Sequence, residues 1–252
     1  MKKNILSVLV FVLFVTLGIT VYAVEWQTIL PTEIPGTGLI RAYNAFILPN
    51  GSAVMEWAWR DDQGFLTRNI PIVDGDIQWC NPGAWISFPV PDLPGSGEMQ
   101  ALNGYILPDG TAFHQGIWRG NQGFNRTVPI RNGEIIWPEA SRWSDPLPIT
   151  IMPGTGDIQA LQSILFPKRN YFFQQVCRGD QLHWRTVPIR NNAIQWPSTS
   201  EWFGPLGIRG FPGSGHVLAT DAFVMPNKTD VLLTVWQGNS ADAQRGIVGL
   251  FV

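Results

Sequence analysis

The chain has 252 residues, of which 45% are hydrophobic and only 14% charged, and its formal net charge is −2. Its 17 basic and 19 acidic residues form no basic stripe, which argues against nucleic acid as the main partner. The chain is tryptophan-rich, with 12 Trp, so it is not disordered, and 26 Gly and 20 Pro are typical of short strands joined by tight turns.

The first residues predict a signal peptide over residues 1–23. Two lysines precede an apolar run from Ile5 to Ala23, which ends in a sequence that signal peptidase can cleave. An uncleaved anchor is the alternative, because the run is nearly as long as the ~20 residues that span a bilayer. Cleavage is favoured because Trp26 already belongs to the repeat described below. We therefore expect residues 24–252 to be one secreted, periplasmic or extracellular domain with no membrane span.

Four copies of one unit of about 59 residues follow. A Pro-Gly-Thr/Ser-Gly motif starts at Pro35, Pro94, Pro153 and Pro212. The same interval separates the small residues Ala42, Ala101, Ala160 and Ala219, and the column Trp59, Trp118, Cys177 and Trp236. With slips of one residue, two further columns are Arg68, Arg126, Arg185 and Arg245, and Trp79, Trp137 and Trp196. This recurrence predicts a repeat array.

Each unit is predicted to form four antiparallel strands, which the second copy illustrates best. Its strands are expected at 99–107, 111–119, 125–131 and 134–137. The dipeptide Asn132-Gly133 favours a tight type I′ hairpin, because both of its positions need positive φ. Four hairpin-connected strands followed by a longer connection are the plan of a propeller blade.

The ends of the chain predict a closed ring. Trp26 precedes Pro35 as Trp85, Trp143 and Trp202 precede the later Pro-Gly motifs, whereas the last unit stops at Val252 before its fourth strand. An N-terminal strand could therefore complete the last blade and leave no open edge. We predict an all-β, four-bladed β-propeller, in which the alanine column lets four inner strands approach the axis. Five-stranded and sandwich-like arrangements are the alternatives.

The two cysteines, Cys80 and Cys177, occupy different places in the first and third units. Their Cα atoms are therefore not expected to come within the ~7 Å that a disulfide requires. We expect two free thiols, behaving as small buried hydrophobes.

The loops after the second strand of each unit carry the candidate binding residues. Each loop offers an aromatic residue, an arginine and an amide or acid, or part of that set. An indole can pack on the C–H face of a sugar while the polar groups exchange hydrogen bonds with its hydroxyls. The Trp residues of the connections are further candidates for surface contact. The predicted ligand-binding residues are Arg60, Asp62, Trp118, Arg119, Asn121, Arg178, Asp180, Asn239, Trp85, Trp143 and Trp202.

The same residues also have a structural interpretation. A Trp at a repeated position is most often packed between blades, as expected of Trp59, Trp118 and Trp236. The arginine column that begins at Arg68 could equally bridge blades as a structural charge.

Several short motifs carry a resemblance to a known group of proteins. Pro-Asp-Gly-Thr at 108–111, Gly-Ile-Trp-Arg-Gly-Asn at 116–121 and Arg-Thr-Val-Pro-Ile at 126–130 are repeated among Trp-rich strands. This style resembles the propeller lectins of the tachylectin and tectonin types. The resemblance covers the repeat style of the mature chain, implies glycan binding and carries over no site residue. A scaffold that binds a cell-surface or extracellular protein is the alternative, because Trp and Arg also dominate protein hot spots.

Catalysis is the least favoured interpretation. Glycosidases need two positioned carboxylates, and neither Glu56, Asp61, Asp62 nor Asp157 stands out from an ordinary polar surface. His114, His183 and His216 lie in three different units without a zinc-binding motif. We therefore expect no enzyme, metal or cofactor, but a lectin-like module with up to four similar weak sites.

Overall fold

The computed structural model describes ten segments of the chain: residues 25–29, 34–87, 93–165, 171–179, 181–191, 193–195, 202–207, 217–226, 230–237 and 242–249. The predicted signal peptide and the candidate site residues Asp180 and Asn239 lie outside them. Within these segments the protein is all-β apart from two 3-10 helices, η3 (Trp137–Glu139) and η4 (Ile149–Ile151). None of the described helices is long and apolar enough to cross a membrane.

The described strands form four antiparallel sheets, the first three each from one repeat unit. The first sheet contains β2 (Ile40–Ile47), β3 (Ala53–Arg60), β4 (Gly64–Val73), β5 (Asp76–Ile77) and β6 (Ile86–Ser87). The second contains β7 (Met99–Ile106), β8 (Ala112–Arg119), β9 (Gln122–Arg131), β10 (Glu134–Ile135) and β11 (Leu147–Pro148). The third contains β12 (Ile158–Leu165), β13 (Tyr171–Arg178), β14 (Gln181–Arg190), β15 (Ala193–Ile194) and β16 (Phe203–Gly207).

The fourth sheet joins the two ends of the described chain. It contains β17 (Val217–Val224), β18 (Asp230–Gln237), β19 (Asp242–Gly249) and β1 (Glu25–Ile29). Strand β1 pairs antiparallel with β19, with Glu25 opposite Ile247 and Ile29 opposite Ala243. The N-terminal strand therefore completes the last sheet, as the order of the repeats predicts.

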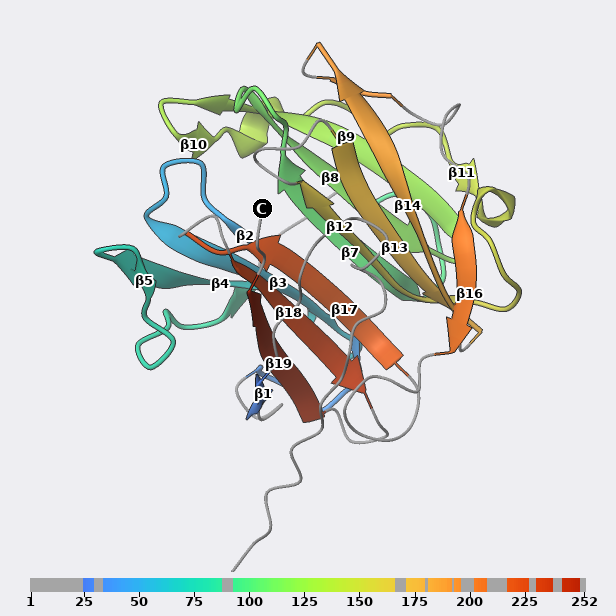
Figure 1. Cartoon of the computed structure of the whole chain (residues 1–252), viewed down its shortest axis with the longest axis horizontal. Helices are drawn as coiled ribbons and strands as arrows, with labels where there is room; N and C mark the ends of the chain where they lie inside the picture. The colour runs from blue at the N-terminus through green and yellow to red at the C-terminus, as the bar shows by residue number, and fades with distance from the viewer. Residues whose placement is uncertain are drawn as a thin grey trace, which may run out of the picture.

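The innermost strands β2, β7, β12 and β17 pack side by side around a common axis, and β17 also packs against β2 (Figure 1). This arrangement of sheets is a β-propeller. Each inner strand has an irregular register immediately before its repeated alanine. All four alanines are buried, which agrees with the expectation of small residues where the strands crowd: Ala42, Ala101, Ala160 and Ala219.

The hairpin turns follow local sequence. Asn132 and Gly133 both have positive φ, 52° and 77°, so the predicted tight turn is confirmed. The preceding turn is shorter than expected, because β9 begins at Gln122 and only Gly120 and Asn121 form the turn. Both of these residues have positive φ, 55° and 62°, which an Asn tolerates better than most residues with a side chain.

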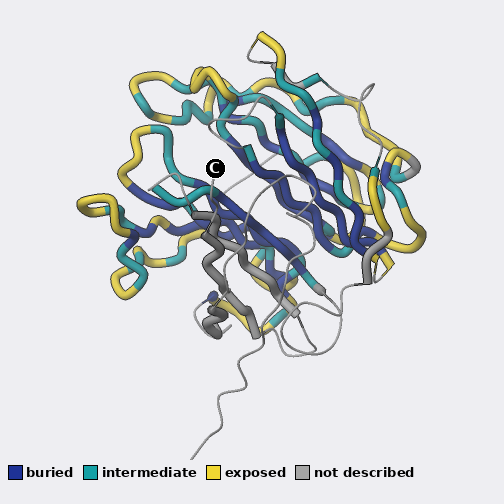
Figure 2. The backbone as a smooth tube through the Cα atoms, viewed as in Figure 1, coloured by how far each residue is buried: buried dark blue, intermediate teal, exposed yellow. Residues whose placement is uncertain are grey.

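Buried residues concentrate on the inner strands and where neighbouring sheets face each other, whereas the turns are exposed (Figure 2). Cys177 is buried in β13, and Cys80 is exposed after β5. Both thiols are free. The expectation of a buried residue was therefore wrong for Cys80, because the chain leaves its sheet at that point.

Candidate functional site

The predicted ligand-binding arginines hold the Pro-Gly turns of their own units. The Nε atoms of Arg60, Arg119 and Arg178 donate to the carbonyl oxygens of Gly38 (2.7 Å), Gly97 (2.9 Å) and Gly156 (2.6 Å). Arg60 also donates to the carbonyl oxygen of Ile34, and Arg178 to that of Met152 (2.9 Å). The repeated arginine therefore has a structural contact in each of these three units.

The neighbouring acid and amide are also engaged by the chain itself. Asp62 accepts hydrogen bonds from the backbone N–H and the hydroxyl of Thr37, and the backbone hydrogen bond lowers the pKa of Asp62 to about 2. The Oδ1 atom of Asn121 accepts from Gln100 Nε2 (2.7 Å), and the backbone N–H of Asn121 donates back to Gln100 Oε1 (2.8 Å). The Nδ2 atom of Asn121 donates to Asp157 of the third unit (3.2 Å). These residues form a hydrogen-bonded rim around the Pro-Gly turns.

The connecting tryptophans pair with the second arginine column. The guanidinium carbons of Arg68, Arg126 and Arg185 lie 4.7, 4.5 and 4.4 Å from the ring centroids of Trp85, Trp143 and Trp202. The Nε atoms of the same arginines donate to Glu56, Gln115 and Gln174. The two columns thus form one acceptor–Arg–Trp unit in each of the first three sheets, held by a cation–π contact.

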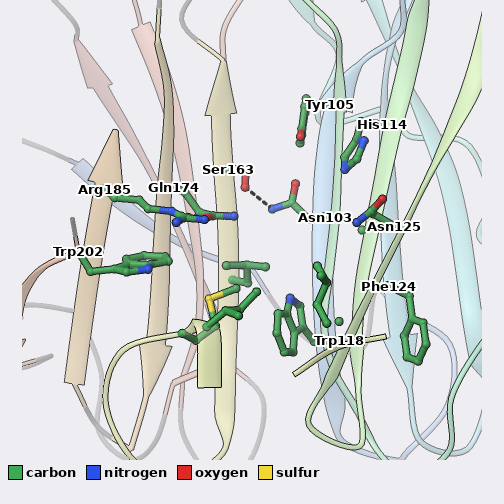
Figure 3. A pocket seen from close by; sticks show the side chains of 16 residues that line it. Asn103, Tyr105, His114, Trp118, Phe124, Asn125, Ser163, Gln174, Arg185 and Trp202 are labelled. Carbon is green, nitrogen blue, oxygen red and sulfur yellow. Dashed lines mark hydrogen bonds between the residues drawn. The ribbon is translucent and has the colours of Figure 1, made fainter. Parts of the chain in front are cut away.

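A cavity of about 530 Å³ lies between the second and third sheets (Figure 3). This volume is within the range of about 300–1,000 Å³ that is usual for small-molecule sites. Its lining comes from both sheets and from the connection between them: Asn103, Tyr105, His114, Gly116, Trp118, Gly123, Phe124, Asn125, Leu147, Ile151, Met152, Leu161, Ser163, Gln174, Arg185 and Trp202.

The cavity exists because the second repeat lacks a large side chain that the first repeat has. Trp57 in β3 is fully buried between the first and second sheets, with its ring 5.1 Å from that of Phe46 and 5.3 Å from that of Phe113. Gly116 occupies the same position in β8, one repeat of 59 residues later. A Cβ atom added to Gly116 would meet no atom closer than 3.9 Å. The missing indole therefore leaves open space.

Gly123 is a second position where the second sheet has a glycine and the first sheet has a large side chain. Strand pairing places Phe65 opposite Trp59 in the first sheet and Gly123 opposite Trp118 in the second. Phe65 packs against Trp57, with ring centroids 5.4 Å apart. In the second sheet the Trp118 indole instead lies directly over Gly123, where an added Cβ would come within 2.6 Å of the ring. Gly123 thus brings Trp118 into the cavity wall.

One end of the cavity is polar and deeply buried. Asn103 donates from Nδ2 to the hydroxyl of Ser163 (2.8 Å), which links the two sheets. Its Oδ1 atom and the hydroxyl of Tyr105 are buried and have no hydrogen-bond partner among the described residues. Gln174 and Arg185 complete this end, and Figure 3 shows these side chains together in the upper half of the view.

Burial sets the charge of the polar end. It raises the pKa of Tyr105 and lowers that of His114 to about 4, so both are neutral at physiological pH. Burial also lowers the pKa of Arg185 to about 10, which still leaves the guanidinium charged. The lining contains no Asp or Glu. This end can therefore bind hydroxyl, carbonyl or carboxylate groups by hydrogen bonds.

The other end is apolar. The indoles of Trp118 and Trp202 face it, and Phe124 lies on the same side in the lower half of Figure 3. Met152 and Leu161 are buried there with 6% of their surface exposed. The indole Nε1 of Trp202 is buried without a partner among the described residues. The cavity therefore combines aromatic surfaces with unfilled hydrogen-bonding positions.

Sequence reasoning identified only part of this lining. Of the predicted residues, Trp118 and Trp202 line the cavity. The other predicted residues that the structure describes do not line it: Arg60, Asp62, Arg119, Asn121, Arg178, Trp85 and Trp143. The polar residues of the inner strands were missed. The sequence does contain one indication of the cavity: Gly116 stands where the preceding repeat has Trp57.

The described residues contain no group of three or more His, Cys, Asp or Glu side chains that could hold a metal ion.

Comparison with known proteins gives remote structural likenesses. No protein-family model and no curated protein matches the chain. An engineered GH43 glycoside hydrolase has a TM-score of 0.46 and 10% identity over 90% of this chain and 43% of its own. AofleA from Arthrobotrys oligospora has a TM-score of 0.42 and 9% identity over 90% of both chains. A Swd1 β-propeller domain from Myceliophteria thermophila has a TM-score of 0.27 and 10% identity over 84% of this chain and 54% of its own. The chain thus spans about half the length of the first and third of these structures.

Proposed function

We propose that this protein is a secreted, non-enzymatic carbohydrate-binding module, folded as a four-bladed β-propeller, and that its sugar site is the cavity between the second and third sheets. The observation that carries the proposal is the segregated lining. Two indoles face one end of the cavity, and buried, unpartnered polar atoms of Asn103 and Tyr105 face the other.

This lining matches the two faces of a sugar. The C–H groups of a pyranose pack on an indole, here Trp118 or Trp202, while its hydroxyls need donors and acceptors at fixed positions. A buried acceptor left unpartnered costs about 1–3 kcal/mol, so a ligand hydroxyl that donates to Asn103 Oδ1 would recover that energy.

A binding role is favoured over hydrolysis because of the charges at the site. Glycoside hydrolysis of the usual type requires an acid and a second carboxylate on either side of the scissile bond. The cavity lining has neither.

One principal site is therefore expected, and not four similar sites on the repeats. The space that corresponds to the cavity is filled by Trp57 between the first and second sheets. The arginine and amide residues recur in the first unit, but the cavity does not recur between the first and second sheets. Binding should be monovalent at this site, with affinity set by the fit to one ligand.

A glycan array on the purified protein tests the proposal, followed by calorimetric titration of any glycan that is retained. Gly116→Leu should abolish binding, because the new side chain projects into the cavity, and should leave the fold intact. Arg119→Ala and Asn121→Ala serve as matched variants of the same sheet, since both residues belong to the rim.

The outcomes separate three interpretations. Loss of binding in Gly116→Leu alone supports the cavity. Loss in Arg119→Ala and Asn121→Ala, with binding kept in Gly116→Leu, would move the site to the rim. If the parent protein retains no glycan, a scaffold that binds an extracellular protein becomes the better interpretation.

A further inference from the structure

The mouth of the cavity differs chemically from its buried polar end. Among the described lining residues only Leu147 and Ile151 are exposed, at 38% and 44% of their surface. Both are apolar, whereas Asn103 and Ser163 are 4% and 6% exposed. Met152, next to Ile151 in the sequence, also lines the cavity and is 6% exposed, so the exposed part of the described lining is apolar and forms the entrance.

Isolated apolar residues on a surface are ordinary. Leu147 and Ile151 are not isolated, because both border one cavity although they come from two different elements, β11 and η4. Strand β11 places Leu147 opposite Gly123 in β9, directly beside the cavity wall. Regular secondary structure therefore positions both side chains at the entrance.

This distribution restricts what can fill the site. A sugar whose hydroxyls faced Leu147 and Ile151 would lose hydration without gaining hydrogen-bond partners from these side chains. An apolar group at the same place would instead remove both side chains and itself from water. The most favourable ligand is hence polar at its inner end and apolar at its outer end.

We propose that the cavity binds an amphiphilic glycoside, whose sugar occupies the polar end at Asn103 and Ser163 and whose apolar aglycone packs against Leu147 and Ile151 at the mouth. This inference rests on the proposed function and adds the class of ligand. The aglycone could belong to a soluble glycoside or to a glycolipid, which share this chemistry.

Matched pairs of methyl and hexyl glycosides of glucose, galactose, mannose and N-acetylglucosamine test the inference by calorimetric titration. Each buried methylene is worth about fourfold in affinity, so two methylenes at the mouth suffice for an increase of about tenfold. We expect the hexyl glycoside of the preferred sugar to bind at least about tenfold more tightly than its methyl glycoside.

Polar substitutions at the mouth identify where the chain packs. Ile151→Ser and Leu147→Ser should each lower the ratio of hexyl to methyl affinity. Ile86→Ser is the matched control, because Ile86 is 60% exposed in β6 of the first sheet and does not line the cavity. It should leave both affinities unchanged.

Phosphatidylcholine vesicles with and without a glycosylceramide distinguish the two sources. If the protein is retained only by vesicles that contain the glycosylceramide, the aglycone is that of a glycolipid. If the protein binds the hexyl glycoside but neither kind of vesicle, the aglycone is that of a soluble glycoside. Equal affinity for methyl and hexyl glycosides overturns the inference but leaves the sugar site standing. An unchanged ratio in both serine variants of the mouth also overturns it. If no glycoside binds, the proposed function itself fails.

Discussion

Two neighbouring interfaces of this propeller are built from the same repeat positions but have opposite properties. Between the first and second sheets, Trp57 is fully buried and packs against the rings of Phe46, Phe65 and Phe113. Between the second and third sheets, Gly116 takes the place of Trp57 and a cavity of about 530 Å³ is present. The residue at one repeat position therefore distinguishes a filled interface from one that contains a cavity.

The partners at the two interfaces correspond as well. Phe46 and Phe113 are 4.5 Å apart between their ring centroids at the filled interface, and Tyr105 and Phe172 are 4.7 Å apart at the open one. The aromatic contact is thus kept, but Tyr105 adds a hydroxyl. The open interface retains enough packing to join the sheets while it gains polar groups that can face a ligand.

The largest effect is expected from emptying the filled interface. Trp57→Ala should lower the free energy of unfolding by about 3–5 kcal/mol, because it removes a buried indole and leaves a cavity. Chemical denaturation followed by circular dichroism measures the loss. Trp59→Ala, two residues along β3 and only partly buried, should cost less. A loss below about 1 kcal/mol for Trp57→Ala would show that another group fills this interface.

A third interface, where β17 packs against β2, should respond to pH. Asp221 accepts hydrogen bonds from Asn44 Nδ2 (2.9 Å) and the N–H of Ala45 (2.6 Å), and burial raises its pKa to about 7, with a contribution from the charge of Glu56. The buried acid is favoured in its neutral form, so its contribution to stability is complete below the unfolded pKa of about 3.8. That contribution is lost as pH rises through 7.

Asp221→Asn isolates this titration from those of other groups, including His114. The free energy of unfolding of the variant, relative to the parent, should rise by about 2–3 kcal/mol between pH 5 and pH 8. Denaturation curves at intervals of one pH unit provide the measurement. A difference that does not change with pH would mean that Asp221 is ionised in the folded protein throughout this range.

A smaller loss is expected when a side chain is added to the filled interface. A Cβ atom on Gly104 would come within 2.4 Å of Phe113 Cζ and 3.1 Å of Trp57. Gly104→Ala should therefore lower the free energy of unfolding by about 1–3 kcal/mol through overpacking. Thermal and chemical denaturation should agree on the sign. A stabilised variant would indicate that this interface has more space than its ring contacts imply.

The smallest effect should have the opposite sign at the open interface. Gly116→Ala places its Cβ no closer than 3.9 Å to any atom and requires no positive φ. It should raise the free energy of unfolding by about 0.5–1 kcal/mol, because alanine loses less backbone entropy than glycine on folding. Comparison with Gly104→Ala in one denaturation series makes the contrast direct. If both variants lose stability equally, the two interfaces do not differ in packing.

The sequence by itself determined the plan of the molecule. Equal spacing of the Pro-Gly motifs and alanines predicts the repeated sheets, because a repeat that recurs at one interval must fold the same way each time. Asn132 and Gly133 predict their turn because local φ preferences are sufficient there. The position of Trp26 predicts the strand that pairs with β19, and this pairing is present.

Only the tertiary structure decided where the cavity lies. A ligand site between sheets depends on side chains from two repeats that face each other, and a comparison along one repeat does not reveal which residues meet. The turn after Arg60 is also one residue longer than the turn after Arg119, so strand pairing aligns Phe65 with Gly123 although the 59-residue spacing aligns it with Phe124. Cavity volume is what remains after facing side chains have packed, and it therefore follows from register and packing together.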